Sequence, residues 1–116
     1  MSKVRAVQAH KIPDRPPLRL SVGQRVTVGQ HDTRWPAFVF VTAEAGQGWV
    51  PSRHLDLDQE SGAATVITPY DTTELPTTVG EILTVVTRDD ASGWVWVQAA
   101  DGRQGWVPND TVEASS

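Results

Sequence analysis

The phrase QGWVP occurs twice, at residues 47–51 and 104–108 of a 116-residue chain. Superimposing the two occurrences sets an offset of 57 residues, and the same offset aligns SVGQRVTV (21–28) with TVGEILTV (78–85). Self-similarity at one fixed spacing is typical of a structural unit that the chain contains more than once. The repeat therefore constrains the fold more than any single residue does.

With one residue gapped on each side, FVFVTAEAG (38–46) also falls on WVWVQAADG (94–102). The sequence thus predicts two copies of one unit, at residues 3–57 and 62–113. Between them, LDQESGAA (57–64) is polar and rich in small residues, as a domain boundary is. Units of about 50 residues are marginal alone, so we expect the two copies to share an interface.

Each copy has the composition of a β protein. Valine and threonine are abundant, and β-branched side chains fit the pleated surface of a strand. Strand-length runs such as QRVTV (24–28) and EILTVV (81–86) are separated by turn sequences such as RDDASG (88–93). The pattern predicts an all-β fold, namely two small five-stranded barrels in tandem.

Charge and composition exclude several classes of function. The net charge of −4 provides no broad basic surface for nucleic acid or for an anionic membrane. No apolar run is long enough to span a bilayer, and the start MSKVRAVQAH does not resemble a secretory signal, so we expect a monomeric cytoplasmic protein. The absence of cysteine excludes a thiolate nucleophile and a cysteine-based metal site.

No catalytic motif is recognisable. The chain has no Gly-rich phosphate loop before a helix and no GxSxG turn. His10, His31 and His54 are not spaced as metal ligands, so no metal and no cofactor is expected. The sequence therefore indicates a protein that is not an enzyme.

Over nearly its whole length each copy resembles an SH3 domain. AVQAH (6–10) and VITPY (66–70) stand where such domains have an ALYDY-like strand, and SGWVWV (92–97) stands where they have a GWW-like strand. GWVPSRHLD and GWVPNDTVE match the closing G.(I/V)PSNYV element. The cysteine-free tandem form looks most like the variant SH3 proteins of bacteria, which the resemblance implies to be ligand-binding.

The resemblance also implies which residues form a ligand groove. In SH3 domains an aromatic groove holds a polyproline II peptide, whose preformed shape lowers the entropy cost of binding. The matching positions of the second copy are Tyr70, Trp94, Trp106, Pro108 and Thr111. In the first copy they are His10, Phe38, Trp49, Pro51 and His54. If the family's groove geometry holds, His10 and His54 lie near each other on one surface.

Strand periodicity adds a second interpretation. In WVWV, Trp94 and Trp96 point to one side of the strand while Val95 and Val97 point to the other. The valines then fill a core, and the aromatic side chains either form an exposed platform or pack one copy against the other.

These features predict a non-catalytic tandem module that binds a peptide or protein ligand, mainly through the second copy. The acidic residues near that copy's groove favour a ligand with a basic residue beside an apolar or proline-rich segment, as the resemblance also implies. They are Asp71, Glu74, Asp89 and Asp90. Two alternatives remain, namely a scaffold whose aromatic faces are buried between the copies and a peptidoglycan-binding module of the bacterial SH3 type.

Overall fold

The computed structural model describes residues 2–12, 16–58 and 60–115. Within these residues there are strands, turns and two short 3₁₀ helices but no α-helix, so the all-β prediction is confirmed. The elements are β1 (Lys3–Ala6), β2 (Arg19–Leu20), β3 (Arg25–His31), β4 (Phe38–Ala43), β5 (Gly46–Pro51), η1 (Ser52–His54), β6 (Leu55–Asp58), β7 (Ala63–Val66), β8 (Tyr70–Asp71), β9 (Ile82–Asp89), β10 (Trp94–Gln98), β11 (Gln104–Pro108), η2 (Asn109–Thr111) and β12 (Val112–Ser115).

The chain forms two compact units that are not the two sequence repeats. Unit 1 comprises the described residues of Met1–Arg15 and Thr73–Ser116, and unit 2 comprises those of Pro16–Thr72. Each unit has a five-stranded antiparallel sheet, in the order β11-β10-β9-β1-β12 in unit 1 and β5-β4-β3-β7-β6 in unit 2. The ladder of each sheet is open at both ends, so the prediction of two tandem closed barrels is not confirmed.

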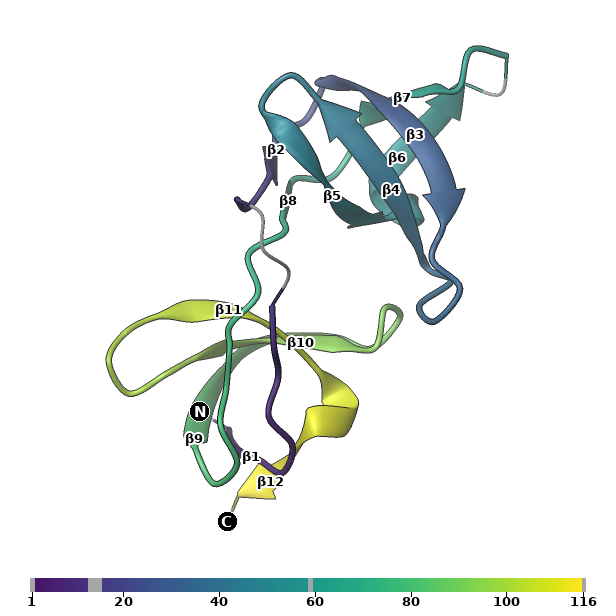
Figure 1. The fold of residues 1–116 in the computed structure, drawn as a ribbon. Helices are drawn as coiled ribbons and strands as arrows, with labels where there is room; N and C mark the ends of the chain where they lie inside the picture. Colours follow the sequence, from purple (N-terminus) through teal and green to yellow (C-terminus); the bar gives the residue numbers. More distant parts are fainter. Residues whose placement is uncertain (1, 13–15, 59, 116) are drawn as a thin grey trace. The chain divides into compact units, whose positions relative to one another are not determined.

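The two sequence repeats exchange their first strands. In Figure 1 the purple strand β1 lies among the green and yellow strands of unit 1, while β7 lies among the strands of unit 2. Strand β1 belongs to the first sequence repeat but pairs with β9 and β12 of the second. Strand β7 belongs to the second repeat but pairs with β3 and β6 of the first. We call residues 2–12 the first segment and residues 62–72 the second segment.

The two segments occupy equivalent places, offset by 60 residues. The register sets Val4 opposite Leu83 in unit 1 and Ala64 opposite Val26 in unit 2, and Leu83 and Val26 are themselves related by the offset of 57. Hydrogen bonds outside the ladders repeat in the same way. They are Ala6 N to Glu81 O and Val66 N to Gln24 O, Val7 N to Thr111 O and Ile67 N to His54 O, and Gly80 N to Ala6 O and Gly23 N to Val66 O.

The stretch 57–64, which we interpreted as a domain boundary, instead contains a hairpin turn inside unit 2. Strands β6 and β7 pair in register from Leu55 opposite Val66 to Asp58 opposite Ala63. The Asp58 carboxylate accepts the Glu60 N–H at 3.1 Å, and Gly62 has a φ of +70°, which glycine adopts at little cost. Polar and small residues serve a tight turn as well as a linker, so composition alone did not distinguish the two. Residue 59 lies outside the described residues.

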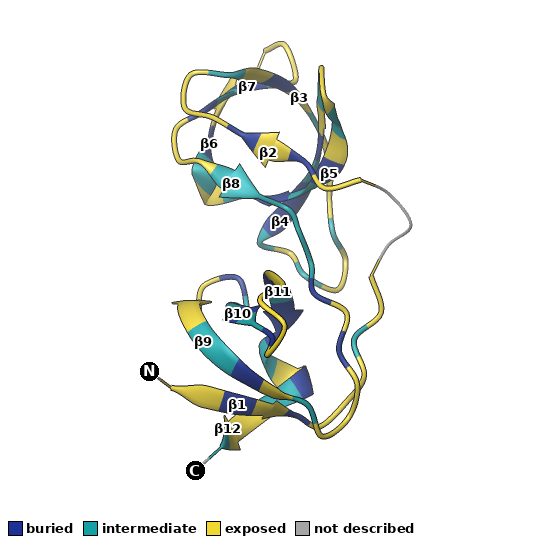
Figure 2. Cartoon of the chain, turned by 90° about the vertical axis from the view of Figure 1, so that its left-hand side faces the viewer, coloured by how far each residue is buried: buried dark blue, intermediate teal, exposed yellow. Residues whose placement is uncertain are grey.

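Alternating side chains build each core. Val95, Val97 and Val107 are completely buried, as predicted, whereas Trp94 and Trp96 on the other side of β10 are half-buried. Figure 2 shows buried stretches within both groups of strands. The core of unit 1 contains Val4, Leu75, Leu83, Val95, Val97, Ala99 and Val107. The core of unit 2 contains Leu18, Leu20, Val26, Val39, Val41, Val50, Leu55, Ala64 and Val66.

Candidate ligand-binding surfaces

The exchange places His10 beside Trp94. The two rings are 5.5 Å apart between centroids and nearly perpendicular, the edge-to-face arrangement that aromatic rings favour. Trp94 begins β10 directly opposite Pro108, the last residue of β11. We define the unit 1 cluster as His10, Glu74, Trp94 and Pro108.

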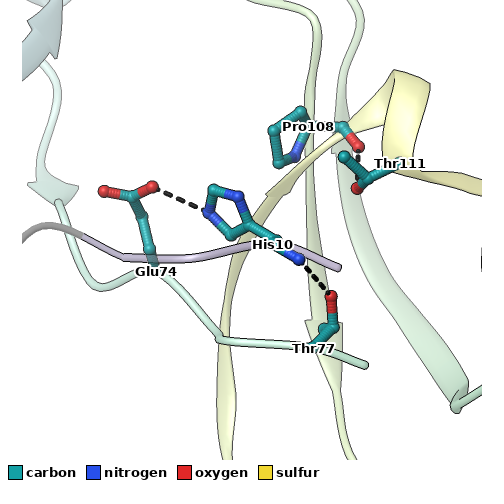
Figure 3. A network of polar contacts seen from close by, with 5 residues as sticks. All are labelled: His10, Glu74, Thr77, Pro108 and Thr111. Carbon is teal, nitrogen blue, oxygen red and sulfur yellow. Dashed lines mark hydrogen bonds and ion pairs between the residues drawn. The ribbon is translucent and has the colours of Figure 1, made fainter. Parts of the chain in front are cut away.

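Glu74 joins this cluster through the histidine. His10 Nε2 lies 2.9 Å from Glu74 Oε1, and the side chains are only 11% and 22% exposed (Figure 3). The backbone of His10 is fixed by a pair of hydrogen bonds with the backbone of Thr77, in each direction at 3.2 Å. The histidine is thus held both by its backbone and by its ring, with one nitrogen directed at a carboxylate.

The segment that carries Glu74 lies against β11. Trp106 N–H donates to Thr73 O at 2.9 Å, and Leu75 N–H donates to Trp106 O at 3.1 Å. This approach requires glycine at position 105, because a Cβ there would lie 2.7 Å from the backbone of both Glu74 and Leu75. Gly105, the glycine of the second QGWVP phrase, therefore allows the segment that carries Glu74 to lie beside the cluster.

Thr111 stands where the resemblance implies a groove residue, but it is buried. Its hydroxyl donates to the carbonyl of Pro108 at 2.7 Å within the turn η2 (Figure 3). This bond fixes the turn that follows Pro108.

Unit 2 has a matching group of different composition. The rings of His54 and Tyr70 lie 5.1 Å apart, again nearly perpendicular. Phe38 lies directly opposite Pro51 at the ends of β4 and β5, and η1 follows with His54 as its last residue. Tyr70 also packs against the core of unit 2. We define the unit 2 cluster as Phe38, Pro51, His54 and Tyr70.

The echoed tryptophans form cross-strand pairs. Trp106 lies opposite Trp96 with the rings 5.3 Å apart, and Trp49 lies opposite Phe40 with the rings 5.1 Å apart. Trp96 Nε1 donates to Gln104 Oε1 at 2.9 Å. Each pair therefore covers a part of its sheet beside the cluster, through contacts between the aromatic rings themselves.

Our grouping of the site residues by repeat is therefore not the one in the structure. Tyr70 contacts His54 in unit 2 rather than completing a surface with Trp94, and His10 contacts Trp94 in unit 1. His10 and His54, which we expected to lie near each other on one surface, thus belong to different units. The cause is the exchange of segments, because each ring follows its strand into the unit formed by the other repeat.

Two further contacts were not foreseen. One is the pairing of His10 with Glu74, which are 64 residues apart. The other is the guanidinium of Arg34 over the ring of Trp35, 5.4 Å from the centroid, in the stretch of unit 2 between β3 and β4. The neighbouring Arg and Trp were the available signal, because this pair is common in cation–π contacts.

Among residues 2–12, 16–58 and 60–115, no group of three His, Asp or Glu side chains could hold a metal ion. In that part of the chain, no helix has the length and apolar character needed to cross a membrane.

Comparison with known proteins finds one family model that matches part of the chain. No curated protein and no solved structure matched the chain. A match to a family model begins at Val66, the last residue of β7, and continues through β12, so the matched stretch is divided between the two units. SH3-type domains are in general non-catalytic modules for protein interaction. The matching family is the variant SH3 domain, which is found once, at residues 66–114.

Proposed function

We propose that the protein is a non-catalytic module that binds a peptide or protein segment at the unit 1 cluster and at the unit 2 cluster. The observation that carries this proposal is the assembly of predicted ligand-binding residues into two aromatic clusters at equivalent places. Both clusters combine aromatic rings with a proline at the end of a strand. Pro51, Pro108 and Phe38 are buried, so the accessible part of each cluster consists of half-buried rings, those of His10 and Trp94 in unit 1 and those of His54 and Tyr70 in unit 2. Accessible apolar side chains that gather on a small protein can mark a contact site.

The unit 1 cluster is the stronger candidate for a ligand with a positive charge. Glu74 is part of it, and Asp89 lies directly opposite Trp94 across β9 and β10. Asp90 is exposed in the following turn, whereas Asp71 belongs to unit 2 and pairs there with Arg19 at 3.2 Å. Complementary charge fixes the orientation of a ligand more than it raises affinity. We therefore propose a proline-rich segment with one basic residue.

The test is a titration of the isotope-labelled chain with a proline-rich peptide that ends in arginine, followed by backbone amide shifts. We expect weak binding, because a shallow surface buries little area and association has an entropy cost. Shifts should concentrate around Trp94 and His10, and a peptide with glutamate in place of arginine should bind less well.

A matched pair of variants separates binding from folding. Trp94→Ala and Trp96→Ala each remove one half-buried tryptophan from the same face of β10, but only Trp94 contacts His10. Trp94→Ala should abolish the shifts, and Trp96→Ala should keep them. If Trp94→Ala instead unfolds the chain, or if no peptide shifts any amide, the scaffold alternative replaces this proposal. Cosedimentation with peptidoglycan in place of peptide binding favours the cell-wall alternative.

A further inference from the structure

We propose that the side chains at positions 4 to 6 and 64 to 66 assign each segment to its unit, and that they thereby decide which ring enters each cluster. The two segments are interchangeable in backbone terms, because they make the same ladder and the same flanking hydrogen bonds. A sequential fold, in which each repeat keeps its own first strand, would satisfy every one of those backbone bonds. The choice must therefore lie in the side chains or in the connections.

The core positions of the two segments are complementary in size. The first segment has Val4 and Ala6 at its two inward positions, and the second has Ala64 and Val66. All four are at most 2% exposed, so a change of side-chain volume at any of them has to be absorbed by the core.

Moving the segments to the other unit would misfit all four places. Ala64 in the place of Val4, or Ala6 in the place of Val66, would leave a cavity. Val66 in the place of Ala6, or Val4 in the place of Ala64, would overfill the core. The misfit occurs in both units at once, because the segments must move together.

Charge acts in the same direction. Arg5 lies opposite Glu113 and forms an ion pair with it. The equivalent residue of the second segment is Thr65, which lies opposite Arg25 and accepts a hydrogen bond from its guanidinium at 3.0 Å. In the sequential fold Arg5 would lie between Asp56 and Arg25, so that its ion pair would be shared with a like charge directly opposite, and Glu113 would face Thr65 instead of Arg5.

The assignment of segments to units also affects which ligand each cluster can bind. This consequence rests on the proposed function, whereas the assignment itself does not. His10 and Tyr70 occupy equivalent positions on the two segments. In the observed fold Trp94 is paired with a histidine that contacts Glu74, and His54 is paired with a tyrosine. In the sequential fold Trp94 would meet Tyr70, and the two histidines would come together. Three strand residues in each segment therefore determine the chemistry of both clusters.

A disulfide reporter distinguishes the two folds, because the natural chain has no cysteine. Lys3 lies opposite Ser115, and its equivalent Ala63 lies opposite Asp58. Residues directly opposite in antiparallel strands are close enough for a disulfide. Lys3→Cys with Ser115→Cys should therefore form an intramolecular disulfide in the observed fold. Lys3→Cys with Asp58→Cys should form one only in the sequential fold.

The decisive variant transposes residues 3–12 and 63–72, so that each stretch occupies the place of the other while Gly62 keeps its position in the β6–β7 turn. Both native cores then form only if the chain folds sequentially. We expect the reporters to reverse: the disulfide between positions 3 and 58 should replace that between positions 3 and 115, as read by peptide mapping of the monomer.

The alternative cause is the β6–β7 turn, which connects the second segment to unit 2 whatever its sequence. A transposed chain that still joins positions 3 and 115 would overturn the proposal in favour of the turn. A disulfide between two copies through positions 3 and 115 would also overturn it, since the segment would then come from a second chain. A variant with fewer changes, Val4→Ala, Ala6→Val, Ala64→Val and Val66→Ala, should raise the yield of the 3–58 disulfide above that of a chain that carries only the reporter cysteines.

Discussion

Unit 1 and unit 2 have the same strand order, but they place different side chains at the same position. Where unit 1 has His10, contacting Trp94 and Glu74, unit 2 has Tyr70, contacting His54 and its own core. The backbone bonds that hold the two places are equivalent. The comparison shows that the sheet specifies where a ring lies, while the segment that fills the first strand specifies which ring it is.

The largest effect should come from a charge in either core. Val97 and its counterpart Val41 are completely buried. An aspartate there would be an unpaired buried charge and should cost roughly 3–5 kcal/mol in the free energy of unfolding. Hydrogen exchange by mass spectrometry should show that Val97→Asp removes protection from residues 2–12 together with 73–115. Val41→Asp should instead expose residues 16–72.

This pair of variants tests the composition of the units as well as their stability. Loss of protection in residues 2–12 on Val41→Asp, and not on Val97→Asp, would mean that each repeat retains its own first strand.

The next largest effect should differ between Gly48 and Gly105, the glycines of the two QGWVP phrases. A Cβ at Gly105 would lie 2.7 Å from backbone atoms, whereas the atom nearest to a Cβ at Gly48 would be in the side chain of Thr72, at 3.2 Å. Gly105→Ala should therefore lower the free energy of unfolding by roughly 2–3 kcal/mol, because backbone must move. Gly48→Ala should change it by less than about 1 kcal/mol, since alanine also reduces the entropy of the unfolded chain. Urea denaturation measures both, and equal losses would contradict the asymmetry.

A smaller contrast is expected between the equivalent rings. Tyr70→Ala removes a ring that packs on the core of unit 2 and should cost roughly 2 kcal/mol, less than a fully buried aromatic residue. His10→Ala removes mainly the contact with Glu74 and should cost about 1 kcal/mol. Thermal unfolding of the two variants gives the order, and a larger loss for His10→Ala would place the histidine in a structural rather than a surface role.

The smallest effect concerns pH at two turns. The backbone N–H of Glu60 holds the pKa of Asp58 below its usual range, and the backbone N–H of Arg103 does the same for the pKa of Asp101. A carboxyl whose pKa is lowered on folding stabilises the fold above its unfolded pKa and loses that contribution as the pH falls through its folded pKa. Both turns should weaken below about pH 4, the usual range for aspartate. Side-chain carbonyl shifts followed by NMR would show the two titrations, and a midpoint above the usual value at either residue would contradict this.

Much of each unit could be predicted from the sequence, because its signals are local. The alternation of valine and tryptophan in WVWV correctly places Val95 and Val97 in the core. The repeated GWVP also marks equivalent strands, since Trp106 and Trp49 each lie opposite an aromatic residue. Such patterns depend on strand periodicity alone.

The exchange could not be predicted in the same way, because the two segments fit the same backbone pattern. A resemblance that runs along the sequence pairs each segment with its own repeat, and on that basis Tyr70 was grouped with Trp94. The turn at Asp58 and Gly62 was visible, but its residues suit a linker equally well. To choose between the exchanged and the sequential fold, one must know how well Val4 and Ala6 fit into a core, and that core exists only once the chain has folded.

The most direct test of the exchange is the set of ring-to-ring nuclear Overhauser effects in the native protein. The account predicts cross-peaks between His10 and Trp94 and between Tyr70 and His54, whose centroids lie 5.5 Å and 5.1 Å apart. Cross-peaks between Tyr70 and Trp94 and between His10 and His54 would show that each repeat folds on itself and would contradict it.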